Sequence, residues 1–245
     1  MSNLFESIFE DDTLLVINKP AGLVCHPTKG DAWSSLVGRV RLYLGDGVHF
    51  HLINRLDRET SGVVVVAKTD EAARNLRQLW DNGHVCKDYI AMVHGHLVES
   101  EGVIDAPLGR DVASRVAIKD CVGSDGARAN TGFRLVCRFF RQSMPFSLVE
   151  IRPKTGRKHQ IRIHLAHLGH SIVGDKLYGG DEDLYLAFVE GRLSESARQR
   201  LILPFHALHA CRLSFPWKGV EMEFEAVAEP WFREFIAGDG DQTPP

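Results

Sequence analysis

The sequence has 245 residues, 44% of them hydrophobic, which is enough for one large domain or two small ones with a sizeable core. Its formal net charge of -3 indicates that any contact with a nucleic acid comes from local clusters of Lys and Arg. Five scattered cysteines, no basic leader and no long apolar run argue against secretion and membrane spanning and favour the cytoplasm.

Most of the predicted elements are strands. They are expected at residues 13–20, 61–68, 84–97, 131–140, 146–153, 208–217 and 220–228, with a short strand or turn at 21–27. A helix is predicted over 70–82, capped by Thr69 and followed by Gly83. A second is predicted over 159–168, closed by Gly169, and the polar segment 181–200 is expected to be helical. This order favours an α+β fold with a mixed or antiparallel sheet.

A basic cluster lies between residues 138 and 162. It contains Arg138, Arg141, Arg152, Lys154, Arg157, Lys158 and Arg162, against the single acid Glu150. Such an excess is typical of a phosphate-binding surface, although a solvated basic face is an equal alternative.

The predicted helix over 159–168 has an apolar stripe made by Ile161, Leu165 and Leu168. Arg162 lies beside this stripe, so its stem should be partly buried while its guanidinium binds a carboxylate. Asp57 is the obvious partner. Asp57 lies between Arg55 and Arg58, where a plain surface ion pair is the simplest alternative.

Histidines on the same helix raise a metal hypothesis. They are His159, His164, His167 and His170, and His206 and His209 follow later. No HExxH motif or thiol pair accompanies them, so we expect hydrogen-bonded or exposed histidines rather than metal ligands.

Four motifs together resemble the RluA-type pseudouridine synthases. They are "NKPAGLVCHP", "NRLDRETSG", "KDYIAMVHG" and "PKTGRKHQIRIHLAHLGHSIVGDKLYG", in the same order and at ordinary spacings. The resemblance covers roughly residues 13–215. It implies a mixed, largely antiparallel central sheet with a catalytic cleft flanked by helices and loops. It also implies that uridine within RNA is isomerised to pseudouridine, without a cofactor or metal.

The resemblance assigns the catalytic carboxylate to Asp57, the active-site tyrosine to Tyr89 and the basic partner of the carboxylate to Arg162. A nearby guanidinium keeps a nucleophilic aspartate ionised against desolvation. Asp57 could attack C1′ of the ribose, add to C6 of the ring, or abstract a proton. Tyr89 could stack on the target base and move a proton, or be a core residue of its strand.

Further residues are expected to bind RNA. The resemblance places Arg55 in the space that the flipped nucleotide leaves, where a planar cation restacks. The expected RNA-binding residues are Arg55, Arg58, Lys87, Lys154, Arg157, Lys158 and His159.

Two positions depart from the family pattern. Asn54 stands where the family commonly has His, so it either shapes the loop or alters the choice of RNA. "SFPWKG" stands where a His-Pro pair is expected.

We expect one catalytic domain over 1–237, without a preceding RNA-binding module, and a flexible tail over 238–245. A monomer acting on a stem-loop of tRNA or rRNA is the simplest expectation. The alternatives are a catalytically idle RNA-binding relative and a histidine-dependent metal hydrolase.

Overall fold

The computed structural model describes residues 4–27, 32–45 and 47–237. The predicted tail over 238–245 lies outside these residues. The chain divides into two compact units. The first unit comprises residues 1–88 and 209–230, and the second comprises residues 89–208 and 231–245. The single domain expected over 1–237 stays a prediction.

The first unit is built around antiparallel strands. Its elements are β1 (Glu6–Glu10), β2 (Leu14–Lys19), η1 (Ala32–Ser34), α1 (Leu36–Leu44), β3 (His51–Leu52), β4 (Ser61–Ala67), α2 (Asp70–Asp81), β11 (Leu208–Trp217) and β12 (Val220–Glu225). Strand β2 pairs antiparallel with β1 and β4, β3 pairs antiparallel with β4, and β12 pairs antiparallel with β11. Strand β11 runs parallel to β4, which makes this sheet mixed.

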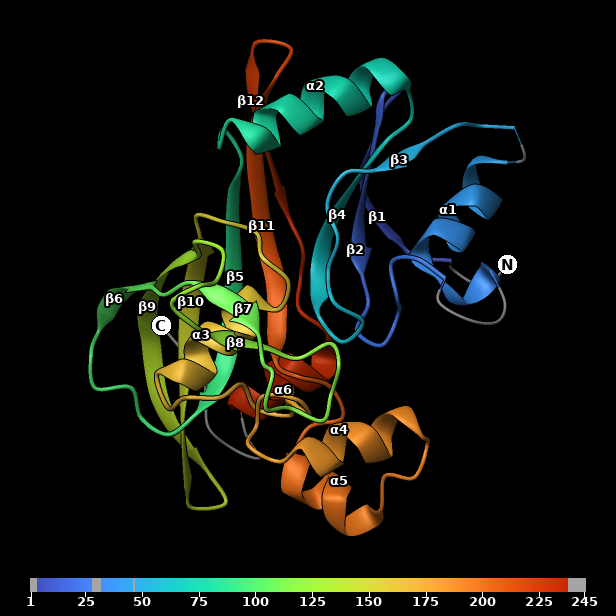
Figure 1. The fold of residues 1–245 in the computed structure, drawn as a ribbon. Coiled ribbons are helices and arrows are strands. Elements are labelled where there is room, and N and C mark those ends of the chain that lie inside the picture. The colour runs from blue at the N-terminus through green and yellow to red at the C-terminus, as the bar shows by residue number, and fades with distance from the viewer. Residues whose placement is uncertain (1–3, 28–31, 46, 238–245) are drawn as a thin grey trace. The chain divides into compact units, whose positions relative to one another are not determined.

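Helix α2 covers the hydrophobic core of the first unit (Figure 1). Its apolar residues Ala72, Ala73 and Leu76 are buried against side chains of β2, β4, β11 and β12. The hydroxyl of Thr69 accepts a hydrogen bond from the backbone N–H of Ala72 at 3.1 Å, which confirms the predicted N-cap.

The second unit is also α+β. Its elements are β5 (Cys86–His94), which begins three residues before the unit, β6 (Glu101–Asp105), β7 (Leu108–Arg110), β8 (Asp120–Val122), β9 (Asn130–Arg141), β10 (Met144–Pro153), α3 (Gln160–His167), α4 (Glu182–Val189), α5 (Glu195–Leu201) and α6 (Pro230–Ala237). Strand β10 pairs antiparallel with β5 and β9, and β6 pairs antiparallel with β9. A smaller core joins Ile163 of α3 to Leu108, Leu177 and Tyr178.

The strand predicted at 208–217 is confirmed with identical bounds, and the segment 181–200 is helical, as α4 and α5. The short strand or turn predicted at 21–27 is a turn, with one isolated bridge between Val24 and Ser35. Helices α1 and α6, the short helix η1 and strands β1, β3, β6, β7 and β8 were missed, because these elements are short.

Candidate active site

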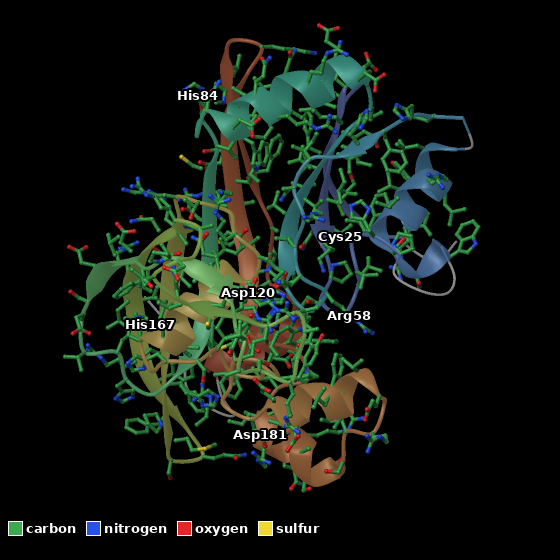
Figure 2. The ribbon with its side chains drawn as sticks, in the orientation of Figure 1. Cys25, Arg58, His84, Asp120, His167 and Asp181 are labelled. Atoms are coloured by element: carbon green, nitrogen blue, oxygen red, sulfur yellow. The ribbon has the colours of Figure 1, made fainter. Side chains whose placement is uncertain are left out.

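Asp57 lies in the loop that joins β3 to β4 in the first unit. Its side chain is half-buried, and its backbone carbonyl accepts a hydrogen bond from the N–H of Thr60 at 3.2 Å. The flanking Arg55 and Arg58 are exposed, and Arg58 donates to the carbonyl of Gly22 at 3.2 Å (Figure 2). The carboxylate therefore stands on a closed turn with a cation on either side of it in the sequence.

Lys19 supports this turn from inside the first unit. Its side chain is fully buried, and Nζ donates to the carbonyls of Pro20 at 2.9 Å, Leu23 at 2.8 Å and Arg58 at 3.2 Å. Burial lowers the pKa of Lys19 from 10.5 to about 8, against the opposing effect of nearby acidic groups that include Asp57. The ammonium therefore remains mostly protonated at neutral pH and ties the "NKPAGL" segment to the Asp57 turn.

Cys25 and Asn54 fix the start of the same loop. The thiol of Cys25 contacts both the carbonyl and the N–H of Leu56, at 3.4 and 3.5 Å, and burial raises its pKa (Figure 2). The carboxamide of Asn54 donates to the carbonyl of Val63 at 3.0 Å and accepts from the N–H of Val65 at 2.8 Å. These two hydrogen bonds join the loop to β4. They agree with the first of the two roles expected for Asn54, in which it shapes the loop.

Gly62 is required by the close approach of β4 and β11. Its φ is +114°, and a Cβ at this position would lie 2.1 Å from the carbonyl oxygen of Ala210. Beside it, the hydroxyl of Ser61 and Nδ1 of the buried His209 lie 2.8 Å apart. The residues that follow Asp57 in "ETSG" thus anchor the loop to two strands.

Tyr89 and Arg162 belong to the second unit. Tyr89 is half-buried on β5, opposite Ile151 of β10, so it is not a fully buried core residue. Lys87 precedes it and is also half-buried, and burial lowers its pKa. The catalytic role of Tyr89 stays a prediction.

Arg162 forms a buried ion pair with Asp175. Its Nε donates to Oδ2 at 2.7 Å and its Nη2 donates to Oδ1 at 2.9 Å. Burial alone would raise the pKa of Asp175, but the charge of Arg162 and its hydrogen bonds outweigh burial and hold that pKa far below its usual range. Asp175 is a carboxylate partner that the sequence analysis did not assign, and the pairing of Arg162 with Asp57 stays a prediction.

The sequence did contain a signal for Asp175. It lies in "VGDKLYG", between Gly174 and Gly179 and eight residues after the end of α3. Its Oδ1 also accepts the backbone N–H groups of Leu177 and Tyr178, both at 2.9 Å. The ring of Tyr178 lies under the guanidinium of Arg162, with Cζ 5.0 Å from the ring centroid.

The turn before α3 is held by Gln160. Its Oε1 accepts from the backbone N–H of Arg157 at 3.0 Å and from the hydroxyl of Thr155 at 2.7 Å. His159 adopts a left-handed conformation with φ of 54°, and its Nδ1 lies 2.9 Å from the hydroxyl of Tyr178. Thus His159, expected to bind RNA, is half-buried against Tyr178.

The basic cluster does not form one uniform surface. Lys154, Arg157 and Lys158 are exposed, and Lys158 pairs with Asp120 at 2.8 Å. Arg138 instead binds the carbonyls of Leu97 and Val98. Arg141 binds those of Phe235 and Ile236 in α6. The phosphate-binding excess is therefore smaller than the residue count indicates.

The predicted apolar stripe of α3 is wrong at one position. Ile161 and Leu165 are buried, but Leu168 is 40% exposed because the helix ends at His167. Arg162, Ile163 and His164 are buried instead, since α3 is covered on more than one side. The prediction that the stem of Arg162 is buried is confirmed.

The histidine hypothesis receives no support from this helix. His164 is buried, its Nδ1 lies 2.8 Å from the hydroxyl of Thr131, and its Nε2 lies 2.9 Å from the carbonyl of Ala106. Burial lowers its pKa. Nδ1 of His170 contacts the carbonyl of His94 at 2.9 Å. Both ring nitrogens of His164 are engaged, so the helix histidines do not offer a shared ligand sphere.

Among the described residues, no helix is long and apolar enough to cross a membrane.

The family model, the sequence relatives and the solved structure that match this chain all carry the name pseudouridine or pseudouridylate synthase. The family model for RNA pseudouridylate synthase matches residues 13–167. The ribosomal large subunit pseudouridine synthase D of Zymomonas mobilis is 35% identical over 230 residues, covering 90% of this chain and 68% of the relative. An uncharacterized RNA pseudouridine synthase of Bacillus subtilis is 36% identical over 236 residues, covering 93% and 70%. The structure of human RNA pseudouridylate synthase domain containing 1 superposes with a TM-score of 0.72 at 26% identity, covering 93% of this chain and 86% of that one.

Proposed function

Because the chain belongs to the RNA pseudouridine synthase family, we propose that Asp57, Tyr89 and Arg162 perform its isomerisation of uridine in RNA. In this reaction the N1–C1′ glycosidic bond breaks, the base rotates, and a C5–C1′ bond forms while the hydrogen on C5 leaves. The observation that carries the assignment is the position of Asp57, within the matched segment, on a loop that Lys19, Cys25 and Asn54 hold in place.

We propose that the carboxylate of Asp57 acts on the nucleotide. It attacks C1′ of the ribose, adds to C6 of the ring, or abstracts a proton. Its half-buried position exposes part of the side chain to a substrate, and it lies on a fixed turn, which keeps the cost of positioning low. The buried ammonium of Lys19 and the exposed Arg55 add positive charge to this part of the first unit. That charge favours the ionised form.

We assign to Arg162 the electrostatic support of Asp57. A guanidinium has five N–H donors in a rigid fork, and Asp175 accepts two of them. Asp175 therefore sets the orientation of Arg162. Tyr89 supplies a ring that stacks on the base and a phenol that takes part in proton transfer from C5.

The substrate class is RNA, and we propose a stem-loop of tRNA or rRNA as its recognised element. The relative in Zymomonas mobilis is named for the ribosomal large subunit, which favours rRNA. We assign phosphate contacts to the exposed Arg55, Arg58, Lys154, Arg157 and Lys158, and further RNA contacts to the half-buried Lys87 and His159. We also propose a monomer in the cytoplasm, where its five free cysteines stay reduced.

Release of tritium from RNA labelled at C5 of uridine tests the assignment of Asp57. The wild-type chain should release tritium, whereas Asp57→Asn and Asp57→Ala should release none and still bind the RNA. Asp125→Asn is the matched control, because Asp125 is exposed on a turn and outside the motifs. Release by Asp57→Ala at the wild-type rate would refute the assignment.

The same assay separates the enzyme from an idle RNA-binding relative. RNA binding without tritium release, from total tRNA and from rRNA alike, would favour the binding protein. Sequencing of pseudouridine positions in the two RNA classes after reaction then decides between tRNA and rRNA.

A further inference from the structure

A second cluster of polar side chains lies in the first unit, outside the Asp57 loop. It consists of His49, His51 and Asp70, whose donor atoms all lie within 4.8 Å of one another. Nδ1 of His49 is 3.1 Å from Oδ1 of Asp70, and Nε2 of His51 is 2.6 Å from the same oxygen. Among the described residues, it is the one group of three or more potential metal ligands with this spacing.

The fold itself brings these residues together. His51 is paired with Ala67 across β3 and β4, and α2 begins three residues later at Asp70. His49 is two residues before His51, and the rings of both contact the same carboxylate oxygen of Asp70. Their rings pack edge to face with centroids 4.7 Å apart.

The cluster is open to solvent. The side chains of His49 and Asp70 are 75% and 63% exposed, and that of His51 is 22% exposed. An ion could therefore enter from solution and keep water as a further ligand. The partly buried His51 provides a fixed point, while the other two side chains can adjust.

We propose that His49 Nδ1, His51 Nε2 and one carboxylate oxygen of Asp70 bind a divalent transition-metal ion of the zinc type, with water completing the coordination. Two imidazoles and one carboxylate suit Zn²⁺, Ni²⁺ or Cu²⁺, whereas Mg²⁺ and Ca²⁺ prefer oxygen ligands. Donor atoms about 2.1 Å from a tetrahedral ion lie about 3.4 Å apart. The 3.1 Å distance from His49 Nδ1 to the Asp70 oxygen therefore needs to lengthen by about 0.3 Å, and the 2.6 Å distance from His51 Nε2 by about 0.8 Å.

Arg77 of α2 competes with the ion. Its Nη2 lies 3.2 Å from Nδ1 of His51. Because a guanidinium only donates, Nδ1 accepts this bond and the ring proton is on Nε2, directed at Asp70. When the ion binds Nε2, the proton moves to Nδ1 and the ring stays neutral. Nδ1 then becomes a donor, so it can no longer accept the hydrogen bond from Arg77. Metal binding therefore breaks the contact between His51 and Arg77, and removal of the Arg77 side chain should strengthen metal binding.

Calorimetric titration of the untagged full-length chain with Zn²⁺ at constant neutral pH tests the site. The wild type should bind one equivalent of Zn²⁺. His49→Ala, His51→Ala and Asp70→Asn should each weaken the affinity for Zn²⁺ by at least about ten-fold. Arg77→Gln should bind Zn²⁺ several-fold more tightly than the wild type. Millimolar Mg²⁺ should not displace the ion.

His84→Ala is the matched control, because His84 is exposed beyond the end of α2 (Figure 2) and contributes no donor to the cluster. It should leave the titration unchanged. The ligand side chains lie at the surface, and a metal-free melting curve of each variant checks its folding. Absence of binding by the wild type would overturn the proposal. So would an unchanged titration in the three ligand variants, since the ion would then be held elsewhere.

The visible absorption of bound Co²⁺ gives a second measurement. Nitrogen and oxygen ligands produce only weak d–d bands, whereas a thiolate such as that of the exposed Cys86 adds strong near-ultraviolet absorption. Weak bands that disappear in His51→Ala support the site. A strong near-ultraviolet band that survives in His51→Ala would overturn it.

Discussion

Arg162 and Asp175 form a two-point ion pair, with Nε donating to Oδ2 at 2.7 Å and Nη2 donating to Oδ1 at 2.9 Å. The side chain of Asp175 is fully buried and that of Arg162 is 8% exposed. The same carboxylate accepts the backbone N–H groups of Leu177 and Tyr178, so the segment after α3 folds around the pair. A residue proposed for catalysis is therefore also part of the core of the second unit.

Arg162→Ala should lower the free energy of unfolding by about 3–5 kcal/mol, because it leaves the charge of Asp175 buried without its partner. Urea denaturation measures this loss. Arg162→Lys is the matched variant, since it keeps the charge but loses the two-point geometry and should be intermediate. Turnover by the folded fraction should also fall in Arg162→Ala. A wild-type unfolding midpoint in that variant would contradict the importance of the pair.

Tyr89→Phe should reduce turnover by about 10²–10⁴-fold and leave RNA binding close to wild type, because the ring is retained while the phenol is lost. Single-turnover tritium release and filter binding measure the two effects separately. Tyr89→Leu also removes the ring and should weaken RNA binding. If Tyr89→Phe turned over at the wild-type rate, the phenol would have no role in proton transfer.

Lys19→Met should remove a pH dependence of stability. The pKa of Lys19 is lowered to about 8 in the folded chain and is 10.5 otherwise, so between these values the unfolded chain binds more protons. The contribution of Lys19 to the free energy of unfolding therefore rises as the pH increases from about 8 to 10.5, by about 3 kcal/mol in all.

Urea unfolding of both proteins at several pH values from 7 to about 10.5 measures the difference. Other titrating groups are common to both and cancel. At neutral pH, Lys19→Met should also be less stable than the wild type, because the carbonyls of Pro20, Leu23 and Arg58 lose their donor. Stability curves that remain parallel over the whole window would disprove the buried charge.

Asn54→Ala should destabilise the chain by about 1–3 kcal/mol, because the buried N–H of Val65 and carbonyl of Val63 lose their partner. It should also slow turnover, since the Asp57 loop loses its attachment to β4. Asn54→His, which introduces the common family residue, should restore most of the turnover if both residues shape the loop. Full stability and turnover in Asn54→Ala would show that the two hydrogen bonds are dispensable.

Local signals determined much of the secondary structure. The cap at Thr69 and the acidic residues Asp70 and Glu71 predicted α2, and the apolar run of β11 predicted its bounds. These elements are encoded within a few neighbouring residues, because capping and side-chain periodicity act over one or two turns or strand positions. The family and its reaction were likewise readable from four contiguous motifs, which the comparisons confirmed.

Only the tertiary structure decided which charges are paired. Sequence reasoning did not assign Asp175, to which Arg162 is bound in the structure. It placed Arg138 and Arg141 in a basic cluster without indicating that both bind backbone carbonyls. It also did not foresee that Lys19 would be buried beneath the Asp57 turn. A buried charge is satisfied by whichever groups the folded chain brings within about 3 Å, and that depends on residues distant in sequence.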